Sequence, residues 1–327
     1  MPAKRAIGIF GMLAGLALIM QPSISARAEQ YPSQTVTLVV PYSAGTGIDI
    51  AARLLADKMQ QRFREPVIVE NRVGASGTIG TASVAKAKPD GYTLLLVGNN
   101  LATLPSLFDL TYDPVTSLAP ISLFLKGSMA LVVNRDVKAD TTAELIALAK
   151  SAPGILNYGS SGLGSPQHLA MELFKSATGI DILHIPYKNA GDALIGILRG
   201  ETAVMFMPVQ SALPNLADGR IRALGLSSLV HHPLVSNLGT IADQIHVKNF
   251  DVDIWYGLFA PAGVPQQVVN VLKDEIAKFL ATPDVLDKLR SLTLVPSPSE
   301  PEELAQLLKS DVSRWSAIIR QAGLSKK

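Results

Sequence analysis

Apolar residues follow two alternating patterns along the chain, short continuous runs and longer stretches with helical spacing. The run at 36–40 is followed by a turn-rich loop and then by an apolar stripe that consists of Ile50, Leu54, Leu55, Met59 and Phe63. A continuous run is typical of a strand buried on both faces, and the stripe predicts an amphipathic helix that Asp49 can cap. Further runs at 67–69 and 93–97 continue the alternation. This order predicts parallel βαβ units.

A second series of the same kind begins near residue 130. It predicts helices between strands at 130–133, 156–159, 182–185, 203–206 and 221–226. Thr141 and Glu144 have the spacing of a capping box, which predicts a helix start. The C-terminal part returns to helices: 266–280 is amphipathic, and Ser299 with Glu302 predicts another capping box before a long apolar stripe.

The two series predict two α/β lobes within one chain. A returning strand at 256–260 and the C-terminal helices are expected to pack on the first series, which makes the first lobe discontinuous. We therefore place the first lobe at 29–127 and 253–327 and the second lobe at 128–252. Two chain crossings, near 126–129 and 252–256, favour a hinge between the lobes.

The N-terminus has the three parts of a secretory signal. Two basic residues precede an apolar run from Ile7 to Met20, and Ala26 and Ala28 place small residues at the positions that a signal peptidase reads. The run is shorter than the roughly 20 residues that span a bilayer, so a cleaved signal at 1–28 is favoured over a membrane anchor. The sequence therefore predicts a protein of the periplasm.

The composition argues against nucleic acids and anionic membranes as partners. The chain has 29 basic and 27 acidic residues, and removal of the three basic residues at 1–28 leaves 26 basic and 27 acidic. This near-neutral balance gives no reason to expect a nucleic acid or an anionic membrane as partner. The sequence has no cysteine, so neither a disulfide nor a lipidated cysteine is expected.

Three glycine-containing loops, at 41–47, 159–165 and 186–191, follow predicted strands and precede predicted helices. In open α/β sheets, ligands bind outside the carboxyl ends of the strands. Glycine lets the backbone approach a ligand closely, and the free N–H groups of a first helical turn attract anions. The alternative is that these loops are ordinary turns that need glycine for their geometry. Several such loops on two lobes favour an anion-binding site between the lobes.

An ordered set of short motifs covers nearly the whole chain after the signal. It consists of Tyr31-Pro32, Val39 to Gly45 with Asp49, Ala52 and Arg53, Val69 to Arg72, Pro89 to Leu94, Leu156 to Ser160, His184 to Lys188, Gly219 to Leu224, Trp255 to Leu258, and Ala260 to Gly263. Together these motifs resemble the Bug family, the extracytoplasmic solute-binding proteins of tripartite tricarboxylate transporters. The resemblance implies a type II, Venus-flytrap periplasmic-binding-protein fold with a hinge between its lobes. It also implies a carboxylate ligand held largely by backbone amides and ordered water.

The resemblance further implies ligand-binding residues at the loop positions. In the first lobe these are Tyr42, Ala44, Gly45, Thr46, Gly47, Asn99 and Asn100. In the second lobe they are Ser160, Ser161, Gly164, Ser165, His168, Tyr187, Asn189 and Ala190. His168 stands near a helix start, where a core or capping role is an equal alternative to ligand contact.

Several positions near these loops depart from the family pattern. Glycine is usual where this chain has Thr46 and Asn189, proline where it has Asp192, and Asp-Asn where it has Met207-Pro208. We add Asp192 to the candidate ligand-binding residues, with two interpretations. It caps the helix after the loop, or its charge faces the site and disfavours a second ligand carboxylate. The second interpretation predicts a ligand with an amino, hydroxyl or neutral group at its far end.

The sequence contains no complete catalytic or metal-binding motif. A serine-hydrolase elbow needs glycine two residues on each side of the serine, and neither Ser161 nor Ser165 meets this requirement. The glycines at 74–80 do not have the spacing of a dinucleotide-binding loop. His168 and Glu172 share a predicted helix face, but without a third ligand a solvated pair is favoured over a metal site.

We therefore predict a binding protein without catalytic residues, metal or cofactor. It is expected to act as a monomer that captures a small carboxylate or amino-acid-like ligand. The expected partners are the membrane subunits of a tripartite tricarboxylate-type transporter. Two alternatives stay open: a ligand sensor that presents its closed state to a membrane signalling protein, and an exported hydrolase.

Overall fold

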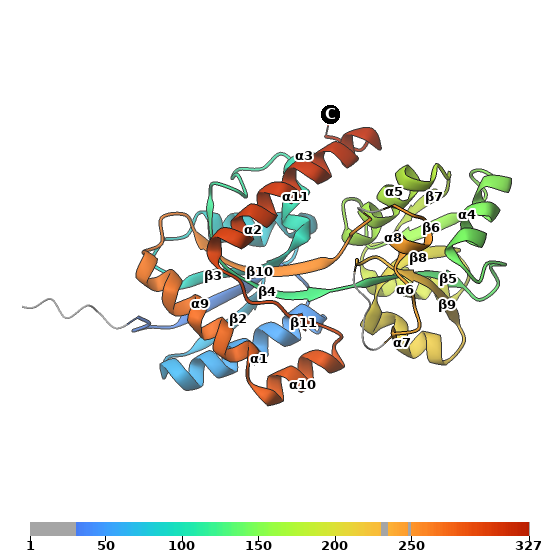
Figure 1. Cartoon of the computed structure of the whole chain (residues 1–327). Coiled ribbons are helices and arrows are strands. Elements are labelled where there is room, and N and C mark those ends of the chain that lie inside the picture. Colours follow the sequence, from blue (N-terminus) through green and yellow to red (C-terminus); the bar gives the residue numbers. More distant parts are fainter. Residues whose placement is uncertain (1–30, 230–234, 248–249, 327) are drawn as a thin grey trace, which may run out of the picture. The chain divides into compact units, whose positions relative to one another are not determined.

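The computed structural model describes residues 31–229, 235–247 and 250–326 (Figure 1). The predicted signal at 1–28 therefore lies outside the described residues. Two sheets, each with its own helices, form two lobes. We call the six-stranded sheet with its helices the first lobe, and the five-stranded sheet with its helices the second lobe. No helix in the described ranges is both long and apolar enough to cross a membrane.

The sheet of the first lobe is mixed. Its strand order is β11 (Val295–Pro296), β4 (Leu118–Gly127), β10 (Ile254–Pro261), β3 (Thr93–Gly98), β1 (Val36–Val40) and β2 (Val67–Asn71). β1 is parallel to β2 and β3, which confirms the predicted parallel units. The predicted returning strand is confirmed within β10, which is antiparallel to β3 and β4. The sequence pattern missed β4 and β11.

The sheet of the second lobe is also mixed. Its strand order is β7 (Leu183–Pro186), β6 (Asn157–Ser160), β8 (Val204–Pro208), β5 (Met129–Asn134) and β9 (Ile221–Leu226). β6 is parallel to β7 and β8, whereas β5 is antiparallel to β8 and β9. All five predicted strands are confirmed. The prediction of parallel units is wrong for β5, because this strand enters the lobe directly from β4 without a crossover helix.

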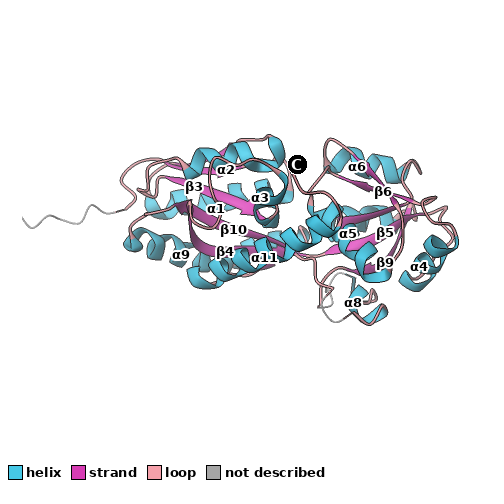
Figure 2. Cartoon of the chain, turned by 90° about the horizontal axis from the view of Figure 1, so that it is seen from above, coloured by secondary structure: helices cyan, strands magenta, loops and turns pink. Residues whose placement is uncertain are grey.

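Helices flank the strands in both lobes (Figure 2). The first lobe contains α1 (Gly47–Phe63), η1 (Ala75–Gly77), α2 (Thr78–Ala85), η2 (Asn99–Ala102), α3 (Leu104–Leu107), α9 (Gln266–Leu280), α10 (Pro283–Ser291) and α11 (Pro301–Gln321). The second lobe contains α4 (Thr142–Ser151), α5 (Pro166–Thr178), α6 (Ala190–Leu198), α7 (Val209–Ala217) and α8 (Ile241–Gln244). The amphipathic helix predicted at 266–280 is confirmed as α9.

One of the two predicted capping boxes is confirmed. The Thr141 side chain accepts a hydrogen bond from the Glu144 N–H at the start of α4, with a distance of 3.1 Å. The box predicted at Ser299 is wrong, because α11 begins after Glu300. The Ser299 hydroxyl instead accepts a hydrogen bond from the Leu123 N–H of β4, at 3.0 Å. A strand donor 176 positions away in sequence takes the place of the helix donor.

Side chains of β1 alternate between two apolar clusters. Val36, Leu38 and Val40 pack in one cluster with residues of α1 and α9, whereas Val39 packs in another with residues of α11. This alternation follows from the two-residue period of a strand. Accordingly, α2 and α11 lie on one side of the first-lobe sheet and α1 and α10 on the other (Figure 1).

The buried face of α1 differs from the predicted stripe. Leu55 and Met59 are buried as predicted, but Ile50, Leu54 and Phe63 are only partly buried. The remaining buried apolar positions of the helix are Ile48, Ala51, Ala52 and Ala56. The pattern overlooked this face because alanine gives little hydrophobic contrast, although its small side chain allows close packing on the sheet.

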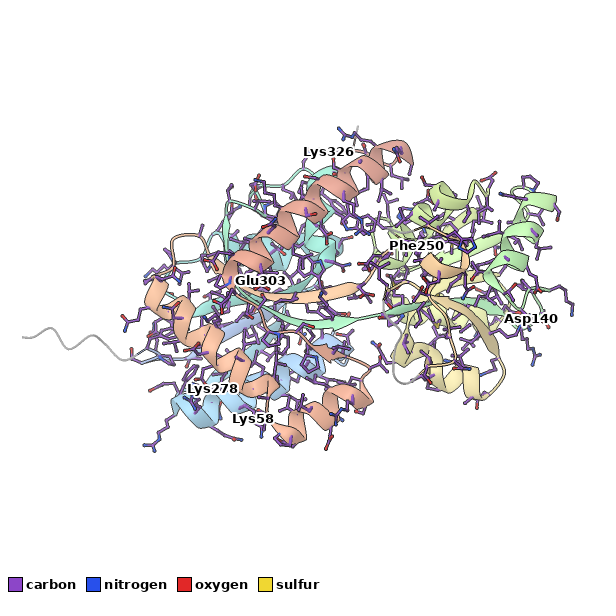
Figure 3. The ribbon with its side chains drawn as sticks, in the orientation of Figure 1. Lys58, Asp140, Phe250, Lys278, Glu303 and Lys326 are labelled. Atoms are coloured by element: carbon purple, nitrogen blue, oxygen red, sulfur yellow. The ribbon has the colours of Figure 1, made fainter. Side chains whose placement is uncertain are left out.

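Helices α1 and α9 lie next to each other, with Lys58 and Lys278 on their outer surface (Figure 3). The Lys58 Nζ lies 2.9 Å from an Asp284 oxygen, and the Lys278 Nζ lies 3.1 Å from a Glu275 oxygen. Solvent screens both ion pairs, so each contributes little to stability. The helix layer is therefore held mainly by its apolar contacts with the sheet.

The chain passes between the lobes at two places. Ser128 separates β4 from β5, and residues 250–253, which we call the return segment, lead back to β10. Phe250 of this segment is buried in the second lobe (Figure 3). Its ring centroid lies 6.0 Å from that of Phe174 and 6.2 Å from that of Phe206. The return segment is thus packed into the second-lobe core before it enters the first-lobe sheet.

Candidate ligand-binding site

The candidate residues lie where strands end and helices begin. In the first lobe, loop 41–47 follows β1 and η2 follows β3; in the second lobe, loop 160–165 follows β6 and loop 186–189 follows β7. β1 and β3 are parallel, as are β6 and β7, so the loops of each lobe lie at one edge of its sheet. Each lobe therefore brings its candidate residues together.

Hydrogen bonds to the buried carboxylate of Asp49 fix the backbone of loop 41–47. Asp49 is 1% exposed, and one of its oxygens accepts a hydrogen bond from the Gly45 N–H at 2.8 Å. Its other oxygen accepts from the Asn71 side chain at 2.8 Å, and Arg53 donates to both oxygens. Asn71 also donates to the Tyr42 carbonyl at 3.0 Å. These bonds fix the backbone of the loop, while Ala44, Gly45 and Thr46 are exposed.

The prediction that Asp49 caps α1 is wrong. The helix begins at Gly47, with Thr46 in the N-cap position and no capping bond from its side chain. Asp49 lies in the first turn, where a negative charge is favourable. Burial raises the pKa of Asp49, but hydrogen bonds from Arg53, Gly45 and Asn71 outweigh it and hold that pKa below its ordinary value. Asp49 is therefore an ionised support for the loop.

The side chains of Tyr42, Asn99 and Asn100 all have protein partners. The Tyr42 hydroxyl donates to the Asn100 Oδ1 at 2.5 Å and accepts from the Gly98 N–H at 2.7 Å. Asn100 is buried and donates to the Ser76 carbonyl at 2.8 Å. Asn99 is 4% exposed and donates to the carbonyl of Asp253, in the return segment, at 3.0 Å. These three side chains tie the loop ends of the first lobe to neighbouring backbone.

Loop 160–165 of the second lobe is tied to two histidines. Ser160 is fully buried, and its Oγ lies 2.7 Å from the Nε2 of His184. The Gly164 N–H donates to the Nδ1 of His168 at 3.0 Å. The Ser165 side chain accepts from the His168 N–H at 3.3 Å, which makes Ser165 the N-cap of α5. His168 is 1% exposed and supports the loop from within the lobe.

The two imidazole rings and a tyrosine form a stack beneath this loop. The His168 and His184 centroids are 4.2 Å apart with an interplanar angle of 12°, and the Tyr158 centroid lies 4.7 Å from that of His184. The predicted solvated pair of His168 and Glu172 is wrong: Glu172 accepts from the Tyr158 hydroxyl at 2.6 Å and pairs with Lys175 at 3.0 Å. Burial lowers the pKa of His168 to about 4. The neutral ring can therefore accept the Gly164 hydrogen bond.

Asn189 and Asp192 form a reciprocal cap at the start of α6. The Asn189 side chain accepts from the Asp192 N–H at 2.9 Å and donates to an Asp192 carboxylate oxygen at 3.0 Å. The N-cap is thus Asn189, and the interpretation of Asp192 as the N-cap is wrong by three positions. Ala190 is exposed in the first turn, and the Tyr187 ring packs against Gly196. Asp192 remains a half-buried charge at a helix start near the loop.

The two lobes are in contact at Gly164 and at Gln210. At Gly164, which has φ of 72°, the space that a Cβ would take is filled by Leu107 of the first lobe. Gln210, the second residue of α7, accepts a hydrogen bond from the Thr293 hydroxyl of the first lobe at 2.9 Å. The sequence analysis assigned no role to Gln210, and it used His184 only as part of a family motif, because the partners of both side chains are distant in sequence. The two lobes are therefore in contact beside loop 160–165 and at the start of α7.

The arrangement does not have the chemistry of a hydrolase. Ser160 and His184 form a close pair, but the serine hydroxyl is fully buried and also bonds to Gly162, at 3.1 Å from both its N–H and its carbonyl. A nucleophile must reach its substrate, so this pair is structural. Within the described ranges, no group of three or more histidine, cysteine or carboxylate side chains could hold a metal.

The family comparison agrees with this geometry. The family described as the tripartite tricarboxylate transporter family receptor matches residues 51–324. The chain belongs to this family. Its members are periplasmic solute-binding receptors and not enzymes, so the resemblance drawn from the motifs is confirmed and the hydrolase alternative is excluded.

Two relatives of this receptor cover almost its whole length. A protein encoded in the tcbD-tcbE intergenic region of Pseudomonas sp. strain P51 is 36% identical over 317 residues, which is 96% of this chain and 94% of the relative. Protein BugT of Bordetella pertussis is 31% identical over 330 residues, or 98% and 97% of the two chains. The shared length places the whole receptor, and not a single lobe, within the family.

Solved structures confirm the two-lobed fold of periplasmic binding proteins. The periplasmic binding protein BugD is 32% identical with a TM-score of 0.79, over 91% of this receptor and 100% of BugD. Rpa4515 of R. palustris, solved with adipate, is 31% identical with a TM-score of 0.81, over 90% and 99%. MatC from Rhodopseudomonas palustris, solved with bound malate, is 29% identical with a TM-score of 0.77, over 88% and 100%.

Proposed function

We propose that this receptor captures a small carboxylate between its two lobes and delivers it to the membrane subunits of a tripartite tricarboxylate-type transporter. The observation that supports this most is how the candidate loops use their polar groups. Their side chains mostly hold the loops in place, as Ser160 and Asn100 do, so backbone N–H groups are left for a ligand. Fixed N–H groups at helix starts are suited to carboxylate binding. The adipate and malate complexes of two relatives support the same ligand class.

Specific N–H groups can be assigned to the ligand. In the second lobe, the N–H groups of Gly162, Gly164 and Ser165 bond within the receptor, whereas those of Ser161 and Leu163 are not used in this way among the described residues. In the first lobe, the N–H groups in the first turn of α1 have no partner within the helix. We propose that a ligand carboxylate binds at these two places.

The proposal includes the lobe boundaries and the composition of the site. The first lobe comprises 29–127 and 253–327, the second lobe 128–252, and the hinge lies at their two crossings. The exposed loop residues Ala44 to Thr46 and Ala190, together with the half-buried Ser161, surround the ligand, and the buried candidates support them. Lys188 is the only cation in the three loops, so amides and helix dipoles, rather than a charged clamp, hold the carboxylate.

A direct test is calorimetric titration of the purified mature chain with adipate, malate, an amino acid and an uncharged analogue. We expect saturable binding of at least one carboxylate, a higher melting temperature in its presence, and no turnover. Small-angle scattering of a monomer should show a smaller radius of gyration at saturation. Failure of every carboxylate, with the uncharged analogue bound instead, would refute the ligand class.

Transport and export need separate experiments. Uptake of the bound carboxylate by cells should depend on this gene; signalling without uptake would favour the sensor. Periplasmic protein should begin near Glu29 if the signal at 1–28 is cleaved. A retained Met1 in the membrane fraction would contradict that proposal.

A further inference from the structure

Gln210 lies at the ligand-binding edge of the second lobe. It is the second residue of α7, which directly follows β8. Because β8 is parallel to β6, the start of α7 lies at the same edge of the sheet as loop 160–165. This is a third strand-to-helix connection at that edge, and it has none of the glycines that mark the other two.

The Gln210 amide spans two segments of the first lobe. Its Oε1 accepts the hydrogen bond from the Thr293 hydroxyl at 2.9 Å, and Thr293 is 2% exposed. Its Nε2 faces the start of α1, where it lies 3.5 Å from the position that a Cβ on Gly47 would take. The acceptor end of the amide is therefore occupied by Thr293, and the donor end points toward the first turn of α1.

We propose that Gln210 is a specificity-determining residue that donates a hydrogen bond from Nε2 to the ligand carboxylate bound at the start of α1. This inference rests on the proposed function of the receptor. It adds a donor from the second lobe to the N–H groups of the first, so one carboxylate group bridges the two lobes. A neutral amide donor stabilises an anion without adding a charge that would also attract other anions.

Two substitutions separate the donor from the rest of the side chain. Gln210→Glu keeps an acceptor for the Thr293 hydroxyl, and the negative charge that it introduces at the start of α7 is compatible with folding. It removes the Nε2 donor and places a charge that repels the ligand carboxylate. Gln210→Met removes the hydrogen bonds at similar volume. Gln266→Glu is the matched control, because Gln266 is an exposed residue in the first turn of α9.

Titration with adipate and with malate is the measurement. For whichever of these carboxylates the wild type binds, Gln210→Glu should weaken binding by at least about tenfold and Gln210→Met by about three- to tenfold, while Gln266→Glu changes Kd by less than about twofold. Melting temperatures should show that all three variants fold.

The outcomes distinguish this inference from the proposed function. Wild-type affinity in both Gln210 variants would overturn the role of Gln210 and leave carboxylate binding intact. A wild type that binds neither adipate nor malate, nor any other carboxylate tested, would overturn both. A loss in Gln210→Met as large as in Gln210→Glu would support a donor role without a contribution from charge repulsion.

Discussion

Replacing Asp253 by Asn should remove a pH dependence of stability that is built into the return segment. Asp253 lines a pocket of about 70 Å³ together with four other charged side chains: Lys126, Asp251, Asp311 and Arg314. The Ser128 hydroxyl, on the other chain crossing, donates to its carboxylate at 3.3 Å. The carboxylate is therefore enclosed by both connections between the lobes and by α11.

The direction of the effect follows from the pKa of Asp253. Burial, and then the neighbouring charge of Asp251, raise this pKa from 3.8 to about 7, while Ser128 and Lys126 oppose the rise. Between about pH 4 and pH 7 the folded protein then holds a proton that the unfolded chain does not. The contribution of Asp253 to the free energy of unfolding must therefore fall as the pH rises through this range. A shift of about three pKa units corresponds to at most about 4 kcal/mol.

Asp253→Asn keeps the shape of the side chain and cannot ionise. We expect the variant and the wild type to be equally stable near pH 4, and the variant to be more stable at pH 8 by up to about 4 kcal/mol. Urea unfolding followed by tryptophan fluorescence reports this region directly, because the two tryptophans of the chain, Trp255 and Trp315, line the same pocket.

The control is Asp274→Asn, which removes a carboxylate from the exposed face of α9. Its stability should stay within about 0.5 kcal/mol of the wild type at both pH values. If the difference between Asp253→Asn and the wild type is the same at pH 4 and pH 8, the carboxylate is not protonated on folding and the reasoning is refuted.

Three further predictions concern the loops of the second lobe. Gly164→Ala should lower the free energy of unfolding by about 2–3 kcal/mol and weaken ligand binding, because a Cβ there meets a first-lobe side chain. The control Gly179→Ala, also at positive φ but with open space, should lower it by about 1 kcal/mol, and equal losses of stability in the two variants would exclude the steric contact. Asp192→Asn should retain the cap with Asn189 and, if the charge of Asp192 faces the ligand, raise the affinity for dicarboxylates relative to monocarboxylates. If calorimetry gives the same ratio of the two affinities in the variant and the wild type, Asp192 is not part of the site. Since the pKa of His168 is lowered to about 4, the contribution of this ring to stability should fall as the pH falls from about 6.5 to 4, opposite in sign to that of Asp253. The difference in free energy of unfolding between the wild type and His168→Gln should therefore change over this range, and parallel curves would contradict a neutral buried ring.

Much of the fold was predictable because local pattern and burial agree. The strand at 36–40, the helix at 266–280 and the cap at Thr141 each depend on residues that are close in sequence. Strand direction was not predictable, since β10 has the same apolar character as the mutually parallel strands β1 and β3 and differs only in how the chain reaches it. β4 was missed because its apolar residues follow no single period, and its pairing with β10 shifts register twice.

The candidate site was predictable at the level of loops and not at the level of side-chain roles. Glycines at 45, 162 and 164 mark the loops, and all three have positive φ. The partners that define the roles are distant in sequence. Asn99 bonds to a carbonyl 154 positions away, and Gln210 to a hydroxyl 83 positions away. No local pattern encodes such pairs, so a candidate contact such as Asn99 proves to be engaged within the protein.

This division of roles has a consequence for specificity within the family. If buried side chains such as Asp49, His168 and Ser160 fix the loop backbone, the carboxylate site can stay unchanged while the ligand varies. Discrimination must then depend on the few side chains that reach the ligand from helix starts, of which Gln210 and Asp192 are the polar examples here. In the proposed site, Gln210 would act by donating to a ligand carboxylate and Asp192 by repelling a second one. A receptor with this pair should favour a ligand with one carboxylate at the start of α1 and an uncharged or amino-bearing far end.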